Sequence, residues 1–98
     1  MNDELPPGLE HVRTTDVFDA QTVPAGLLRD HRIAAGVWGR LTVHEGSLRF
    51  VFEDRADAPV HIEAGESMII PPSTPHHVEP EAEVRFAIEF HRSPTGGS

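Results

Sequence analysis

The sequence predicts a small all-β domain, a sandwich or barrel of jelly-roll type. Its 98 residues allow one domain with one core. The 9 prolines and 8 glycines are spread along the chain, and the apolar runs between them are short, as strands bounded by turns are. No segment sustains the period of an amphipathic helix. We therefore expect one barrel domain over residues 1–92, beginning with an extended arm, and a flexible tail at residues 93–98.

The expected elements follow an arm that covers Leu5–Thr15. His44–Ser47 predicts a tight hairpin, because Gly46 can adopt the positive φ that such a turn requires. Beyond it, apolar and polar residues alternate from Leu48 to Glu53, which gives that strand one apolar face. In chain order, the expected strands lie near Val17–Phe18, Leu27–Ile33, Gly36–His44, Ser47–Glu53, Val60–Glu63, Ser67–Ile70, His77–Glu79 and Val84–Phe90.

Composition excludes several classes of function. The formal net charge of -8, from 16 acidic and 8 basic residues, disfavours nucleic acid as a partner. The absence of cysteine excludes a disulfide framework, a thiolate metal site and a cysteine nucleophile. The sequence has no apolar run of about 18 residues, and its N-terminus is acidic where a secretory signal would be basic and then apolar. We therefore expect a cytoplasmic protein without a membrane partner.

The segment Gly65–His77 carries the strongest indication of a functional site. An apolar run ends in a proline-rich turn, which stops the strand and stiffens the approach to two adjacent histidines. Successive side chains of an extended chain point to opposite faces, so only one of the two histidines can readily face an interior pocket. We assign that position to His76.

This segment resembles the second cupin motif, which runs glycine, five residues, proline, one residue, glycine, two residues, histidine. Gly65, Pro71 and His76 fall at the matching places. Ser73 stands where the motif has its second glycine, and Pro80 replaces the motif's final asparagine.

The first cupin motif, which normally supplies two histidines and a glutamate upstream of a glycine, is much weaker in this chain. If Gly46 is that glycine, Gly39 stands where the glutamate belongs. Only His31 lies close enough to serve as a histidine ligand. A standard site of three histidines and one glutamate therefore cannot be assembled from this part of the sequence.

A closer resemblance covers nearly the whole chain and points to the TehB/YeaR-like family. It rests on segments that occur in the family's order, namely Leu5–Leu9, Pro24–His31, Gly36–Leu41, Glu45–Phe50, Ile70–Pro72, Pro75–His76, Arg85–Phe86 and Glu89–Phe90. In that family the domain occurs alone or at the N-terminus of tellurite-resistance methyltransferases. The resemblance implies a compact cupin-like β-barrel (a double-stranded β-helix) with a metal site. It does not imply methyl transfer, because the chain has no glycine-rich nucleotide loop.

The candidate metal ligands are His31, His76 and Glu89, which lie on three separate stretches that resemble family motifs. Imidazole and carboxylate ligands suit a divalent ion such as Zn, Fe, Mn or Ni. Two histidines with one carboxylate would leave coordination positions open for water or a substrate. His91 is the first reserve ligand, because it shares a strand face with Glu89, and His77 is the second.

Glu89 is open to a second interpretation. Simple alternation in its strand aims Phe86, Ile88 and Phe90 inward and Glu89 toward solvent. Glu89 could still face the barrel if the phenylalanines packed against a partner subunit or the N-terminal arm, or it could pair with Arg85 on the surface. His31, likewise, could be a strand residue that hydrogen-bonds a backbone carbonyl.

Three hypotheses for the function follow. The favoured one is a small metal-binding protein that binds or senses a small molecule or an oxyanion, in keeping with the family's association with tellurite and nitrogen-oxide stress. The second is a metal-dependent cupin enzyme, such as a dioxygenase, isomerase or hydrolase. The third is a metal-free structural module. A homodimer is expected under all three, because small jelly-roll sheets often cover an edge or an apolar face by pairing.

Overall fold

The computed structural model describes residues 5–28, 33–55 and 57–92. The predicted all-β fold is confirmed, with two short 3-10 helices among the strands. Within the described residues neither helix is long or apolar enough to cross a membrane. The elements in chain order are β1 (Glu10–Thr14), β2 (Phe18–Asp19), η1 (Ala25–Leu28), β3 (Val37–Glu45), β4 (Ser47–Phe52), η2 (Glu53–Arg55), β5 (Val60–Glu63), β6 (Ser67–Ile70), β7 (His76–Pro80) and β8 (Arg85–Arg92).

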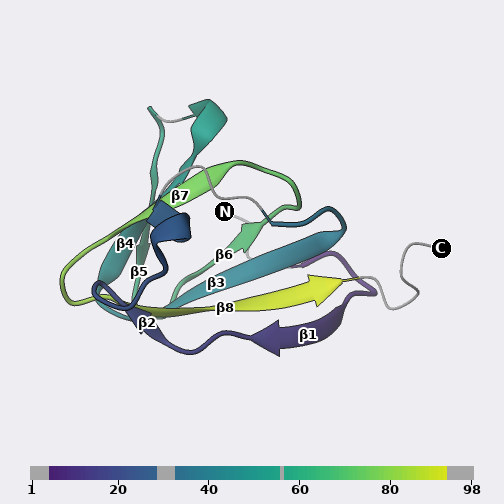
Figure 1. The fold of residues 1–98 in the computed structure, drawn as a ribbon, viewed down its shortest axis with the longest axis horizontal. Coiled ribbons are helices and arrows are strands. Elements are labelled where there is room, and N and C mark those ends of the chain that lie inside the picture. Colours follow the sequence, from purple (N-terminus) through teal and green to yellow (C-terminus); the bar gives the residue numbers. More distant parts are fainter. Residues whose placement is uncertain (1–4, 29–32, 56, 93–98) are drawn as a thin grey trace.

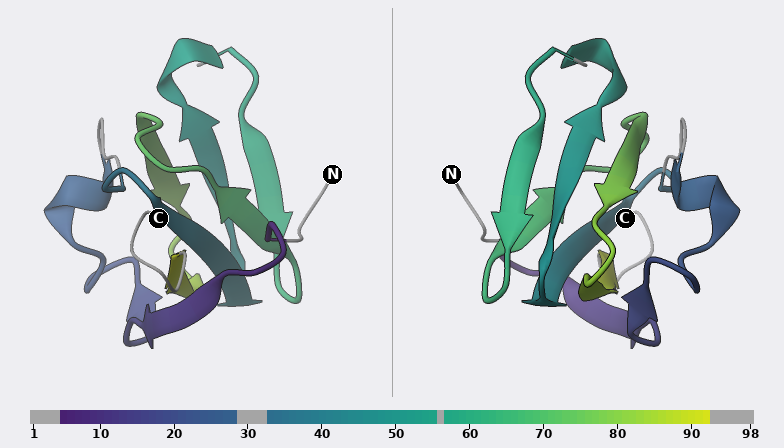
Figure 2. Two further views of the ribbon diagram at one scale, coloured as in Figure 1. Left: turned by 90° about the vertical axis from the view of Figure 1, so that its right-hand side faces the viewer. Right: turned by 90° about the vertical axis from the view of Figure 1, so that its left-hand side faces the viewer.

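The strands form two antiparallel sheets (Figure 1). The larger sheet has five strands in the order β1-β8-β3-β6, and β2 also pairs with β8. The smaller sheet has three strands in the order β5-β4-β7. Figure 2 shows both sheets from the two ends of the molecule, with η1 outside the strands at one side.

One core joins the two sheets. The apolar face predicted for β4 is confirmed, because Leu48, Phe50 and Phe52 all lie in the buried cluster, although Val51 on the other face is buried too. The Phe50 and Phe52 rings pack edge to face with their centroids 5.0 Å apart. The larger sheet contributes Leu41, Val43, Met68, Ile70, Phe86 and Ile88 to the same cluster, and the smaller sheet adds Ile62 and Val78.

The turn at Gly46 has the predicted backbone conformation but not the predicted partners. Gly46 has a φ of 70°, as expected. The predicted hairpin is wrong, however, because β3 pairs with β6 and β8 whereas β4 pairs with β5 and β7. The chain therefore crosses from one sheet to the other at Gly46. A side chain at this glycine would meet the backbone of Glu83, since its Cβ would lie 2.8 Å from the Glu83 carbonyl oxygen.

Two other segments near the N-terminus differ from the prediction. The extended arm is partly a paired strand, since β1 adds to the edge of β8. The strand expected over Leu27–Ile33 is wrong where the structure describes it, because Leu27 and Leu28 end the 3-10 helix η1. Pro24 starts that turn, and its carbonyl accepts a hydrogen bond from the Leu27 N–H at 2.9 Å. Residues 29–32 and the tail at 93–98 lie outside the described residues.

Candidate functional site

The turn before His76 has a backbone conformation that glycine adopts readily. Ser73 has a φ of 58° and is the one non-glycine residue with positive φ among those described. This is the position at which the second cupin motif has glycine, so the backbone conformation persists although the residue type does not. The Ser73 N–H donates a hydrogen bond to the Ile33 carbonyl at 2.8 Å, which helps to hold the turn. The sequence did contain a signal for this conformation, because the motif has glycine at the position of Ser73.

His76 opens β7 and faces the interior, as assigned from the sequence, while alternation turns the neighbouring His77 the other way. Its side chain is 1% exposed, and its ring stacks on Phe50 with a centroid distance of 4.9 Å and an interplanar angle of 22°. The Nδ1 atom lies 2.8 Å from the Thr74 carbonyl oxygen. Because a carbonyl can only accept, Nδ1 must carry a proton in this hydrogen bond. A backbone hydrogen bond of this kind is how proteins orient metal-binding histidines.

The residues that flank the His31 segment both lie against the strand or turn of His76. On the N-terminal side, η1 packs against β7. On the C-terminal side, the hydrogen bond from Ser73 anchors Ile33 to the turn before His76. His31 itself lies outside the described residues. The described residues on both sides of that segment therefore contact β7 or the turn before it.

Glu89 does not share a face with His76. Phe86 and Ile88 are buried in the core, so alternation along β8 places Glu89 on the outer face of the larger sheet. Its Oε1 atom lies 3.1 Å from Nε2 of His91. The simple pattern is therefore the one observed: the phenylalanines pack in this chain's own core, and the carboxylate contacts His91 rather than Arg85. The first reserve ligand, His91, lies on this outer face as well.

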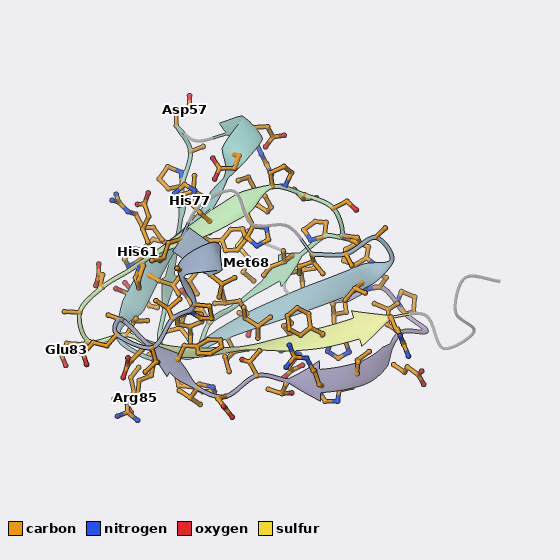
Figure 3. The ribbon with its side chains drawn as sticks, in the orientation of Figure 1. Asp57, His61, Met68, His77, Glu83 and Arg85 are labelled. Carbon is orange, nitrogen blue, oxygen red and sulfur yellow. The ribbon has the colours of Figure 1, made fainter. Side chains whose placement is uncertain are left out.

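His77, the second reserve ligand, faces away from His76. It lies between two carboxylates, with Nδ1 2.7 Å from Oε2 of Glu53 and Nε2 3.0 Å from Oε2 of Glu79. Figure 3 shows His77 beside β7, at the smaller sheet. Glu79 also forms an ion pair of 3.1 Å with Arg49. Within residues 5–28, 33–55 and 57–92, no group of three histidine or carboxylate side chains is placed to hold a metal ion.

The contacts of His77 shift two pKa values in opposite directions. The hydrogen bond to Glu79 raises the pKa of His77, burial offsets part of that effect, and Glu53 raises it further. The same hydrogen bond lowers the pKa of Glu79, with burial opposing and Arg49 assisting. Both shifts act in the direction that favours a charged His77 beside a charged Glu79.

Stability should depend on pH through this cluster. The raised pKa of His77 stabilises the fold below the imidazole's ordinary value of about 6.5, and that contribution is lost as the pH rises through the folded value. The lowered pKa of Glu79 stabilises the fold above about pH 4.3, and that contribution is lost as the pH falls. We expect His77→Gln to lower the free energy of unfolding by about 0.5–1 kcal/mol at pH 5.5, after allowance for solvent screening, and by less at pH 8.5.

Urea unfolding at the two pH values measures this difference. His61→Gln is the matched control, because the His61 ring lies 3.3 Å from Glu63 but is 48% exposed. An effect of His77→Gln that is the same at both pH values would contradict the assignment.

Comparison with known proteins agrees with this architecture. Residues 13–88 match the TehB-like domain family. The chain is 30% identical to the uncharacterized protein YeaR of Escherichia coli K12, over 93% of this chain and 84% of YeaR. A structural-genomics protein from E. coli K12 has the same fold, with a TM-score of 0.84 at 29% identity, over 93% of this chain and 97% of that one.

A more distant neighbour supports the wider fold class. A protein from Shewanella frigidimarina that contains a cupin-2 domain superposes with a TM-score of 0.52 at 22% identity, over 83% of this chain and 64% of its own. At that identity the likeness concerns fold alone, and it agrees with the predicted cupin-like jelly roll. Together with the family match over most of the sequence and the relation to YeaR, it confirms the resemblance drawn from the motifs: the chain belongs to the TehB-like domain family.

Proposed function

We propose that this chain is a small metal-binding cupin-like domain in which His76 and His31 hold a divalent ion, Zn, Fe, Mn or Ni. The observation that carries the proposal is the hydrogen bond from His76 Nδ1 to the Thr74 carbonyl, because it orients a buried ring in which Nε2 would be the coordinating atom. The stack on Phe50 restrains the ring further. Nitrogen and oxygen ligands are the available set, since the chain lacks cysteine.

His31 enters the proposal because the described residues offer His76 no other set of ligands. No three histidine or carboxylate side chains of the described part are placed to hold a metal ion, and Glu89 lies on the outer face of the larger sheet beside His91. We therefore leave Glu89 out of the site. Two protein ligands would leave coordination positions for water and a small ligand, and the bound ion would act there as a Lewis acid.

The proposed ligand is a small molecule or an oxyanion that binds at those open positions. The family resemblance is what connects this proposal to tellurite or nitrogen-oxide stress. An anion would be attracted locally by a divalent ion although the chain as a whole carries a net charge of -8.

Metal content tests the proposal. Protein purified without an affinity tag and incubated with each of the four ions should retain metal through desalting. His76→Ala and His31→Ala should each lower the affinity about tenfold or more, whereas Glu89→Gln should retain wild-type affinity. His61→Ala is the matched control, because it removes an exposed imidazole on β5. A wild-type chain that binds none of the ions would refute the proposal, and loss of metal in Glu89→Gln would refute its ligand set.

A further inference from the structure

A β-bulge in β1 turns Arg13 to the inner face of the larger sheet. In a regular strand, residues 11 and 13 would share a face. The register of β1 on β8 shifts between them, so that His11 is opposite His91 and Arg13 is opposite Phe90. Because His91 and Phe90 are consecutive residues of β8, they face opposite ways. Bulges of this kind often re-aim a side chain beside a functional site.

Side-chain contacts on both faces agree with this register. On the outer face, the His11 and His91 rings pack edge to face with centroids 5.3 Å apart. On the inner face, the Arg13 guanidinium carbon lies 5.2 Å from the centroid of the Phe90 ring, within the range of a cation–π contact. The irregularity in the edge strand thus places one guanidinium over one aromatic ring.

Arg13 borders a pocket of about 180 Å³. The pocket opens between β1, β2 and η1 on one side and the end of β8 on the other. Its size is close to that of a cavity of about 150 Å³ that holds benzene. The apolar part of its lining includes Phe18, Leu27, Ile88 and Phe90.

Arg13 is the charged group among the described residues that line this pocket. Thr15, which also lines it, accepts a hydrogen bond from the Ile88 N–H at 3.1 Å and donates one to the Asp16 carbonyl at 2.9 Å, so its hydroxyl is already engaged. Arg13 has no carboxylate partner in the described parts of the chain, in contrast to Arg49, which pairs with Glu79 at 3.1 Å.

We propose that this pocket binds a small organic carboxylate. The apolar body of the ligand packs against Phe18, Leu27 and Ile88, and its carboxylate binds the Arg13 guanidinium, whose planar donors match a carboxylate in a bidentate manner. The contact with Phe90 holds the guanidinium at the rim. No histidine or carboxylate side chain is among the described residues of its lining, so this site is independent of the metal proposed at His76.

Benzoate is the probe, because its ring suits the volume of the pocket and its carboxylate is ionised at pH 7. Titration of the full chain, monitored by amide chemical shifts in the presence of a chelator, should shift resonances of Arg13, Thr15 and Ile88. The expected dissociation constant is about millimolar or somewhat tighter, as for other ligands of this size. Benzyl alcohol, which has a similar ring and no charge, should bind about tenfold or more weakly.

Arg13→Gln should weaken benzoate binding about tenfold or more and leave benzyl alcohol unchanged. Arg85→Gln is the matched control, because Arg85 lies on β8 at the end remote from β1 and does not line this pocket (Figure 3). The proposal is overturned if benzoate causes no saturable shift at about 10 mM, several times the expected dissociation constant. It is also overturned if Arg13→Gln and wild type bind benzoate equally, or if benzyl alcohol binds as tightly as benzoate. The chelator separates these outcomes from any failure of the metal site.

Discussion

Gly46→Ala should lower the free energy of unfolding by about 2–4 kcal/mol. Two effects add at this position. The φ of 70° lies in the left-handed region, which costs a residue with a Cβ about 1–2 kcal/mol. The new Cβ would also lie 2.8 Å from the carbonyl oxygen and 2.9 Å from the carbonyl carbon of Glu83. These are backbone atoms, so the chain between β7 and β8 has to move rather than a flexible side chain.

Two other glycines separate those effects. Gly65 has a φ of 89° but open space around its Cβ position, so Gly65→Ala should cost only the backbone term of about 1–2 kcal/mol. Gly26 has open space and no positive φ, so Gly26→Ala should be neutral or should stabilise by about 0.4–1 kcal/mol. Urea unfolding of the three variants measures the series. Equal losses in Gly46→Ala and Gly65→Ala would mean that the sheet-to-sheet crossing has no steric requirement for glycine.

Much of the fold was predictable because proline and glycine residues mark the ends of many strands. β5 and β6 have the predicted limits, Val60–Glu63 and Ser67–Ile70, since proline and glycine residues flank both. The error at Gly46 has a different origin. A glycine specifies the φ of a turn, but the partners of the two strands it joins depend on contacts far apart in the sequence, here with β6, β8, β5 and β7.

The candidate site was predictable in part for the same reason. Alternation limited the inward position to one of the two adjacent histidines, the motif context favoured His76, and its 1% exposure confirms that orientation. The same rule, applied to β8, turns Glu89 outward, and the structure follows this alternation, with Glu89 beside His91. Arg13 could not be found in this way, because a bulge breaks the period of two on which such predictions depend. The metal role of His76 stays a prediction.

Phe50→Ala should lower the free energy of unfolding by about 3–5 kcal/mol, among the largest effects of any substitution in this chain. Phe50 is fully buried, and its ring contacts Phe52 edge to face and His76 face to face. Truncation removes both ring contacts and opens a cavity at the centre of the core that neighbouring strands cannot readily collapse into. Urea unfolding measures the loss, and Val60→Ala, on a half-buried residue packed against the same cluster, is the milder comparison.

Phe50→Leu separates the volume of the ring from its stacking. It fills most of the space and should cost less than Phe50→Ala, but it removes the aromatic face on which the His76 ring rests. A double-mutant cycle of Phe50→Leu with His76→Ala should therefore give a coupling energy of about 0.5–1.5 kcal/mol. A coupling near zero would show that the stack on Phe50 does not help to orient His76. If the stack does orient the ring, and if His76 binds metal as proposed, Phe50→Leu should weaken metal binding in a chain that remains folded, because the His76 ring loses its stacking restraint.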